Sequence, residues 1–237
     1  MALILGNFIR YDYMPSFTKL SRSRLELFLE CPRCFWLLMN RDVKRPPGFP
    51  FTLNNAVDAL LKAEFDKHRV AGTAHSLIKK YKIDAIPFSH GDIDKWRHNF
   101  SGVQFEHKRS GFLVYGAVDD VWKDSSGNLI VVDYKATGAK EHKIHDSYKR
   151  QMEVYQWLLK MNGFSVSDLG YFLFAKVDKT QGFKEAKLSF ELLLEPCPGN
   201  SGWVEKEIMK ARRCLKGKLP SLSDECDYCK WCVAQKF

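Results

Sequence analysis

Two carboxylates and a lysine, Asp119, Asp133 and Lys135, have the residue types and spacing of a catalytic centre. Asp133 and Lys135 lie two residues apart after the apolar run Leu129–Val132, so on a strand their side chains point to the same face. Asp119 ends the segment Gly116–Asp119, and a turn-forming stretch between the two segments can bring it alongside Asp133. We therefore expect two carboxylates and one ammonium group to converge on a β-hairpin.

The chemistry expected of this group is metal-dependent hydrolysis. Carboxylate oxygens are hard ligands that suit Mg²⁺ or Mn²⁺, and the expected ligands are Asp119, Asp133 and a backbone carbonyl near Tyr134. Lys135 can orient an attacking water or stabilise developing charge. The alternative is a surface strand on which Asp133 and Lys135 simply pair. The combination of Gly-x-x-Asp, a turn, a buried apolar strand and Asp-x-Lys favours the catalytic interpretation.

The cysteines form a second group with chemical potential. One Cys-x-x-Cys pair, Cys31 and Cys34, lies near the start, and Cys226, Cys229 and Cys232 lie near the end. Each pair can present two thiolates to one metal, so residues 20–50 and 217–237 are expected to meet at a four-cysteine site that joins them. Zinc and iron–sulfur clusters both accept four thiolates, and the symmetric set without Cys232 fits Zn²⁺ at least as well.

The cysteines are expected to be ligands or free thiols, because no export signal is recognisable and a reducing, cytoplasmic location follows. No apolar stretch reaches the length of about 20 residues that a bilayer requires. No membrane partner is therefore expected.

The surrounding elements follow from hydrophobic periodicity and turn residues. Strands are expected over Phe112–Trp122, Leu129–Lys135, Tyr171–Val177 and Lys187–Leu194, with a turn at Asp124–Asn128. Helices are expected from a capping box at Ser23–Glu26 to shortly before Pro32, from Asn54 through Phe65, near Asp92–Phe100, over Ser147–Met161 and over Trp203–Lys216. This order predicts one α/β domain over residues 1–237, with a central mixed sheet flanked by helices.

The hairpin motif resembles the core of the PD-(D/E)XK nuclease superfamily, and more closely its RecB-like branch. The segment from Leu20-Ser21-Arg22-Ser23 to Cys31-Pro32 is similar to the opening helix of that branch. Gln151 and Tyr155 match its Gln-x-x-x-Tyr element and share a helix face. The resemblance implies a restriction-endonuclease-like core, with this pair beside the active site and helping to hold DNA.

The resemblance also extends to metal ligands, with one departure at the carboxylates and two at the cysteines. Asp58 stands where the branch usually has a metal-binding His, and Glu64 is the next candidate on the same helix. CRISPR-associated exonucleases and AddB-type nucleases of this branch carry a [4Fe-4S] cluster, so the resemblance implies such a cluster here, with Cys31, Cys226, Cys229 and Cys232 as ligands and a structural Zn²⁺ as the alternative. Here Cys34 is an additional candidate, and the last cysteine spacing is shorter than in those proteins.

The charge agrees with a polyanionic partner: 37 Lys and Arg against 28 Asp and Glu give a net charge of +9. We expect a Mg²⁺- or Mn²⁺-dependent deoxyribonuclease, by resemblance an exonuclease on single-stranded ends in repair, recombination or CRISPR adaptation with a protein partner. The alternatives are a DNA-binding module with weak or lost catalysis, favoured by the Asp58 departure, and an RNA nuclease. The sequence has no phosphate-binding loop of the Gly-x-x-x-x-Gly-Lys-Ser/Thr type, so no ATPase activity is expected.

Overall fold

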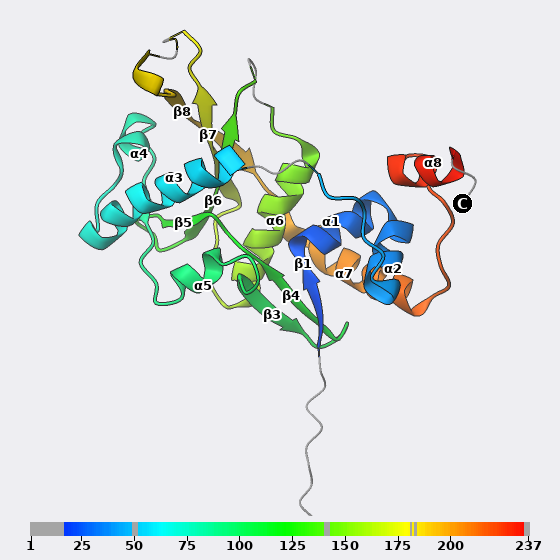
Figure 1. Ribbon diagram of the computed structural model, residues 1–237. Coiled ribbons are helices and arrows are strands. Elements are labelled where there is room, and N and C mark those ends of the chain that lie inside the picture. Colours follow the sequence, from blue (N-terminus) through cyan, green and yellow to red (C-terminus); the bar gives the residue numbers. More distant parts are fainter. Residues whose placement is uncertain (1–16, 49–51, 140–142, 181, 183, 235–237) are drawn as a thin grey trace, which may run out of the picture.

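The computed structural model describes residues 17–48, 52–139, 143–180, 182 and 184–234 (Figure 1). Its strands are β1 (Thr18–Ser21), β2 (Ile86–Pro87), β3 (Val103–His107), β4 (Phe112–Gly116), β5 (Asp120–Lys123), β6 (Leu129–Thr137), β7 (Leu169–Val177) and β8 (Phe190–Pro198). Its helices are α1 (Arg22–Glu30), α2 (Pro32–Arg41), α3 (Thr52–Ala71), α4 (Ser76–Lys80), α5 (Ile93–Arg97), α6 (Asp146–Met161), α7 (Val204–Lys216) and α8 (Asp227–Ala234), with short 3-10 turns at Lys184–Ala186 and Ser201–Trp203.

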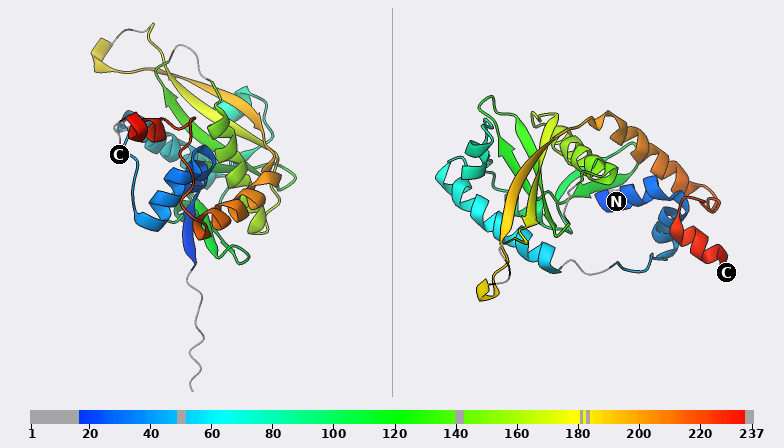
Figure 2. Two further views of the ribbon diagram at one scale, coloured as in Figure 1. Left: turned by 90° about the vertical axis from the view of Figure 1, so that its right-hand side faces the viewer. Right: turned by 90° about the horizontal axis from the view of Figure 1, so that it is seen from above.

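The strands form two sheets. The larger has the order β2-β5-β6-β7-β8, and only its β6–β7 pair is parallel. Helix α6 makes the crossover between those two parallel strands, as a parallel connection requires. The smaller sheet has the order β1-β4-β3. The mixed α/β architecture with a central mixed sheet and flanking helices is confirmed (Figure 2).

Helices cover both faces of the larger sheet, so β6 is buried on both sides. Leu129 and Val131 pack into the core that includes α1, α6 and α7, whereas Ile130 and Val132 pack into the core beneath α3 and α4. This alternation explains why β6 is apolar at consecutive positions rather than at every second one. It also assigns Asp133, which follows in register, to the α6 face of the sheet.

The predicted hairpin is confirmed, but the expected strand Phe112–Trp122 is divided in two. Strand β4 belongs to the smaller sheet and β5 to the larger one. Between them the chain leaves both sheets, and the Val118 amide donates to the Trp96 carbonyl of α5 at 3.1 Å. Residues 112–118 form one run without a charged residue, so the sequence pattern alone did not reveal the break. The turn before β6 is as expected, with Gly127 at φ 88°.

Three expectations for helix starts were wrong or incomplete. Ser21, not Ser23, caps α1, because its side chain accepts the Arg24 amide at 3.1 Å. Pro32 begins α2, which was not predicted; its fixed φ and missing N–H suit a first helical position. Helix α3 is already helical at Thr52, two residues before the expected cap at Asn54.

Other differences concern elements outside the β5–β6 hairpin. Strands β1 and β3 and helix α8 were not predicted, and β8 begins at Phe190 rather than Lys187. The expected helices over 147–161 and 203–216 correspond to α6 and α7. Among the described residues, no helix has the length and apolar character needed to cross a membrane.

Candidate functional site

The hairpin brings its two carboxylates and its lysine together. Strand β5 starts at Asp120, opposite Val132, so the part of β6 beyond Val132 has no β5 partner. At that point Asp119 Oδ2 accepts the Tyr134 amide at 2.8 Å, which replaces the missing backbone bond and holds the carboxylate beside β6. Asp133 is fully buried, and its Oδ2 forms an ion pair with Lys135 Nζ.

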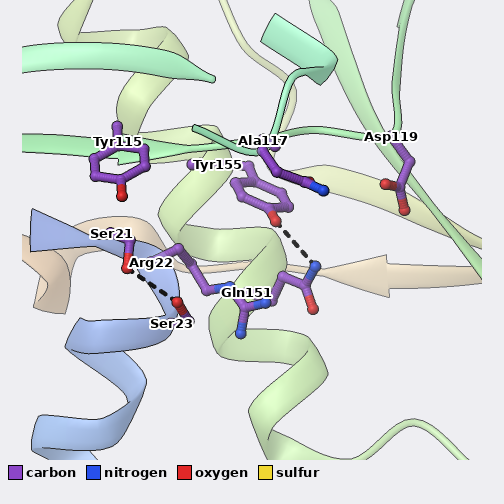
Figure 3. Close-up of a pocket in the computed structure, with 10 residues that line it drawn as sticks. Ser21, Arg22, Ser23, Tyr115, Ala117, Asp119, Gln151 and Tyr155 are labelled. Carbon is purple, nitrogen blue, oxygen red and sulfur yellow. Dashed lines mark hydrogen bonds between the residues drawn. The ribbon is translucent and has the colours of Figure 1, made fainter. Parts of the chain in front are cut away.

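Helix α6 supplies the polar partners of Asp133. Gln151 Nε2 donates to Asp133 Oδ1 at 2.7 Å and lies 3.0 Å from the Tyr155 hydroxyl (Figure 3). A cavity of about 320 Å³ is lined by Asp119, Gln151, Tyr155 and residues of α1 and β4. The spacing of four residues between Gln151 and Tyr155 therefore directs both side chains to one side of α6, where the cavity lies.

Gly116 allows this packing. A Cβ atom at this position would lie 2.7 Å from Tyr155 Cε1 and 3.4 Å from the Arg22 Cβ. The first of these contacts is shorter than carbon atoms tolerate, so only glycine lets β4 pass this close to the tyrosine ring. The glycine of the Gly-x-x-Asp motif thus shapes the cavity rather than the turn.

Helix α3 brings a third carboxylate to the site. Asp58 Oδ2 lies 2.7 Å from Lys62 Nζ, and the same ammonium lies 3.7 Å from Asp119 Oδ1. Lys62 therefore sits between the two carboxylates, a position that no sequence pattern indicated. Glu64, the other candidate on this helix, is half exposed and contacts His75 Nε2 at 2.7 Å instead. The structure places Asp58, and not Glu64, beside the hairpin.

Burial and crowded negative charge perturb the carboxylates. Burial, with the charge of Asp133 next in size, raises the pKa of Asp119 to about 6. Burial and the charge of Asp119 likewise raise the pKa of Asp58. Burial by itself would lower the pKa of Lys135, but the Asp133 and Asp119 carboxylates outweigh it and raise that pKa. The site thus holds more negative charge than its lysines comfortably balance.

Asp120, next to Asp119, is a functional neighbour that the sequence did not single out. It is fully buried and pairs with Arg69, with Arg97 at 3.0 Å and with the Tyr134 hydroxyl at 2.8 Å. Arg97 also donates to the Asp119 backbone carbonyl at 3.1 Å. These contacts fix the backbone from which Asp119 projects. The adjacent acidic pair Asp119-Asp120 was the available signal, because two neighbouring strand residues face opposite sides.

The donor atoms of the three carboxylates fit a hard divalent cation. Asp58 Oδ1 is buried and has no hydrogen-bond partner among the described residues. Asp133 Oδ2 likewise accepts no hydrogen bond there and is held by the Lys135 ion pair alone. Buried oxygens of this kind are costly unless a cation compensates them. The carboxylates are more widely spaced than the cysteines, the one group of described metal-ligand side chains whose ligand atoms all lie within 4.8 Å.

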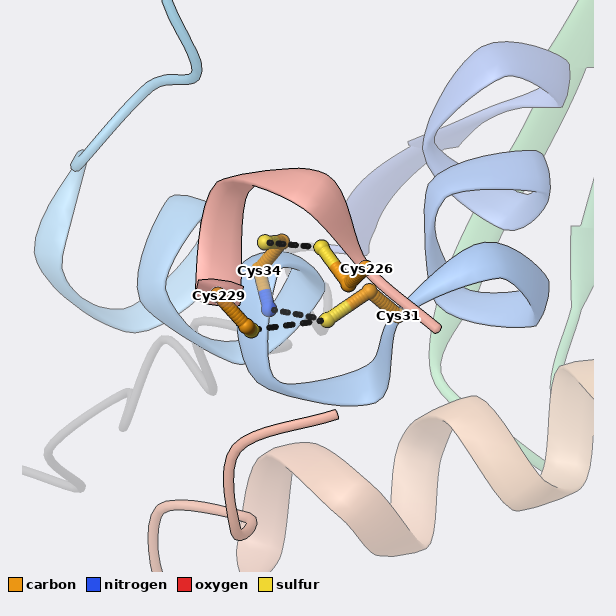
Figure 4. Close-up of side chains that lie close together, drawn as sticks. All are labelled: Cys31, Cys34, Cys226 and Cys229. Carbon is orange, nitrogen blue, oxygen red and sulfur yellow. Dashed lines mark hydrogen bonds between the residues drawn. The ribbon is translucent and has the colours of Figure 1, made fainter. Parts of the chain in front are cut away.

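The cysteine site gathers Cys31, Cys34, Cys226 and Cys229 (Figure 4). The Sγ atoms of Cys31 and Cys229 are 3.7 Å apart, as are those of Cys34 and Cys226. Four thiolates on one tetrahedral ion with Zn–S bonds of about 2.3 Å have S···S separations of about 3.8 Å. A four-iron cluster attaches each thiolate to a different iron, which holds the sulfurs farther apart. The observed spacing fits a single ion, and Cys232 lies outside the group.

Local structure explains why these cysteines meet. Cys31 ends α1 and begins α2, and its Sγ accepts the Cys34 amide at 3.4 Å. Arg45 Nη2 lies 3.5 Å from Cys226 Sγ and supplies positive charge beside the thiols.

Burial raises the pKa of Cys34 to about 12. Burial would raise that of Cys226 too, but hydrogen bonds from Cys229 and from the Cys31 and Cys34 side chains lower it to about 7.

Comparison with known proteins places this arrangement in a family. No curated protein matches the chain. Among solved structures, the crystal structure of SSO0001 matches with a TM-score of 0.45 and 12% identity, over 93% of this chain and 85% of that chain. This similarity is too low to transfer any property. The family model of the PD-(D/E)XK nuclease superfamily matches residues 50–233, a segment that contains the whole β5–β6 hairpin. The chain therefore belongs to the PD-(D/E)XK nuclease superfamily.

Proposed function

We propose that this protein is a Mg²⁺- or Mn²⁺-dependent deoxyribonuclease whose active site is the hairpin of Asp119, Asp133 and Lys135. The observation that supports this most strongly is the convergence of Asp119, Asp133 and Gln151 at one end of the central sheet, beside the cavity next to α6. Superfamily membership implies nuclease activity and DNA as the substrate. A purely DNA-binding surface gains nothing from buried carboxylates that face a polyanion.

Asp119, Asp133 and Asp58 are the residues that would hold the divalent metal, together with a backbone carbonyl near Tyr134. When bound, the metal supplies charge neutralisation at the scissile phosphate and a more acidic water. The unpartnered Asp58 Oδ1 supports the choice of this residue. Lys62 contacts both Asp58 and Asp119, so its ammonium would leave that position when the cation takes over their charge.

The remaining residues orient the reacting groups. Lys135 is 19% exposed while its Nζ pairs with Asp133, so it can hold a water between that carboxylate and the phosphate. Gln151 fixes the rotamer of Asp133 through its amide, and the Tyr155 hydroxyl lies against the same amide. Arg22 lines the cavity and would contact a phosphate there.

The proposed substrate is a single-stranded DNA end, cut by exonucleolytic hydrolysis in repair, recombination or CRISPR adaptation. For the cysteine site we propose one structural Zn²⁺ held by Cys31, Cys34, Cys226 and Cys229, rather than a [4Fe-4S] cluster. The 3.7 Å sulfur separations support the single ion. Such an ion would fix the junction of α1 and α2 against the α8 segment.

The test is degradation of end-labelled single- and double-stranded DNA and of RNA with Mg²⁺ or Mn²⁺. Wild-type protein is expected to degrade DNA, and Asp133→Asn and Lys135→Met are expected to lose more than the about 10–100-fold that follows removal of an outer-shell partner. Asp146→Asn and Lys149→Met on α6 are matched controls, because both side chains are at least half exposed. Binding without cleavage under either metal would favour the DNA-binding module.

A further inference from the structure

The cavity beside the hairpin shares lining residues with a second cavity, which in turn shares lining residues with a third cavity at the cysteine site. The second cavity, about 430 Å³, shares Arg22 and Ser23 with the first. The third, about 550 Å³, shares Lys44 and Arg45 with the second. Helices α1 and α2 lie between α6 and α8 in the fold (Figure 1). The shared lining residues order the three cavities from the hairpin to α8.

The path is lined by positive charge that is not fully neutralised. Arg22, Arg24 and Arg33 form no ion pair with a carboxylate in the described part of the chain; Arg24 and Arg33 donate to backbone carbonyls instead. The two acidic residues of the second cavity are already occupied: Glu26 by Arg150 at 2.6 Å and Glu30 by Arg45 at 2.7 Å. The third cavity also contains Asp227, which pairs with Lys230 at 3.2 Å. Phosphates in the second cavity would therefore meet available arginines, and both carboxylates there already have a basic partner.

The far end of the path has a different chemistry. The third cavity is mainly apolar and contains two exposed aromatic rings on α8, Tyr228 (39% exposed) and Trp231 (60% exposed). Arg45 already covers Tyr228, with its guanidinium carbon 4.6 Å from the ring centroid. Trp231 stacks on no other aromatic ring of the described residues. An open indole face beside arginines and a lysine has the features of a base-stacking site.

We infer that a single strand of DNA runs from the active-site cavity along α1 to Trp231, where an unpaired base stacks on the indole ring. This inference rests on the proposed deoxyribonuclease function and adds a substrate-binding site beyond the catalytic hairpin. Unpaired bases expose the π-faces that such a site requires, whereas those of a duplex are stacked on one another. The basic residues of the path suit the phosphates of a single strand, and its apolar area suits the bases.

Binding without cleavage tests the path directly. In the Asp133→Asn background, without added Mg²⁺ or Mn²⁺, Trp231→Leu is expected to raise the Kd for oligothymidine by about 5- to 150-fold, the value of one base–aromatic stack. Trp231→Phe restores most of the affinity because it keeps a π-face. The Kd for a blunt duplex stays unchanged. An oligonucleotide containing 2-aminopurine loses fluorescence on binding only when residue 231 is aromatic.

Charge along the path gives an independent readout. Lys44 is 70% exposed, so Lys44→Gln can be made without loss of packing. It is expected to lower the slope of log Kd against log salt by about 0.7, the contribution of one phosphate on a single strand. Phe100→Leu and Lys79→Gln are matched controls, because both residues are exposed and line none of the three cavities.

The outcomes separate this inference from the proposed function. If the protein binds and degrades single-stranded DNA but Trp231→Leu and Lys44→Gln behave like the controls, the path is wrong and the nuclease stands. The apolar cavity would then be a protein-docking face. If the protein neither binds nor degrades DNA, the proposed function fails together with the path. Retained zinc content in each variant verifies that α8 is still in place.

Discussion

The molecule has two candidate metal centres that differ in ligand, position and construction. The carboxylate site uses hard oxygen donors on strands and helices of the central domain, and its donors are incompletely compensated. The cysteine site uses soft sulfur donors, gathered from segments 198 residues apart, as for Cys31 and Cys229, into a group within 4.8 Å. An open site with uncompensated carboxylates suits an exchanging ion and a reacting substrate, whereas a closed site with four ligands suits a permanent structural ion.

The largest effect is expected when the closed site of four cysteines is disrupted. Cys31→Ser should remove the bound zinc and lower the Tm by more than about 5 °C, because loss of several kcal/mol shifts a domain of this size by about 2–4 °C per kcal/mol. Metal analysis and thermal unfolding measure both. Cys232→Ser is the matched control and should retain the ion. Four irons and a visible absorbance band in anaerobically purified protein would contradict the single-ion proposal.

Next in size is the third carboxylate of the open site. Asp58→Asn should weaken Mn²⁺ binding by more than the about 10- to 100-fold that loss of an outer-shell partner costs, and leave zinc content unchanged, since it removes one proposed ligand from the open site alone. Calorimetric titration with Mn²⁺ measures the change. Glu64→Gln on the same helix should have no effect, because Glu64 contacts His75. Reversed results for these two variants would move the ligand to Glu64.

A third prediction concerns the glycine at the cavity wall. Gly116→Ala should destabilise the fold by about 1–3 kcal/mol, because the added methyl group overlaps the Tyr155 ring and forces it or β4 to shift. Denaturant unfolding measures the loss, and cleavage should fall with it. Gly91→Ala is the control, since nothing lies within 4 Å of its added carbon. Equal stability of the two variants would show that the Tyr155 ring moves aside without cost and would contradict this prediction.

The smallest expected effect is a dependence of the open site on pH. The pKa of Asp119 is raised to about 6, so a proton competes with the cation below that value. Mn²⁺ affinity should fall by at most about tenfold per pH unit below pH 6. In the metal-free protein, ionised Asp119 lowers the free energy of unfolding above pH 6, and this penalty disappears below the pKa that the residue has in the unfolded chain. Asp119→Asn should therefore be more stable than the wild type at pH 8 but not at pH 4. A variant that is equally stabilised at both values would contradict the assignment.

The hairpin could be predicted from the sequence because the patterns that indicate it lie within a short segment. Period-two alternation places Asp133 with Lys135, and the turn chemistry at Gly127 fixes the pairing that brings Asp119 alongside. The roles of Asp120 and Lys62 depend on contacts between residues far apart, such as Asp120 with Arg69 and Arg97, which no local period encodes. The break between β4 and β5 was missed for the same reason, since the uncharged run of residues 112–118 continues past the point where the chain leaves β4.

The cysteines show the same limit. Two Cys-x-x-Cys motifs predict a shared ion, but the choice between Cys34 and Cys232 is made by the α1–α2 junction, where Cys31 caps α2 and thereby presents Cys34 beside it. Helix α2 itself was not predicted, because Pro32 can follow the end of one helix as well as begin the next. Position in space, not spacing in sequence, selects the fourth sulfur.

Because the two cysteine pairs lie far apart in the sequence, the ribosome synthesises them at different times. A ribosome adds about 5–20 residues per second, so Cys31 waits about 10–40 s before Cys229 is made, 198 residues later. A chain interrupted in that interval can contain the catalytic hairpin in full but has no Cys226, no Cys229 and no α8. Such a fragment would lack both the sealed ion and the distal nucleotide contact. If the proposed ion and the proposed stacking site are both required, tight DNA binding is limited to chains that include α8.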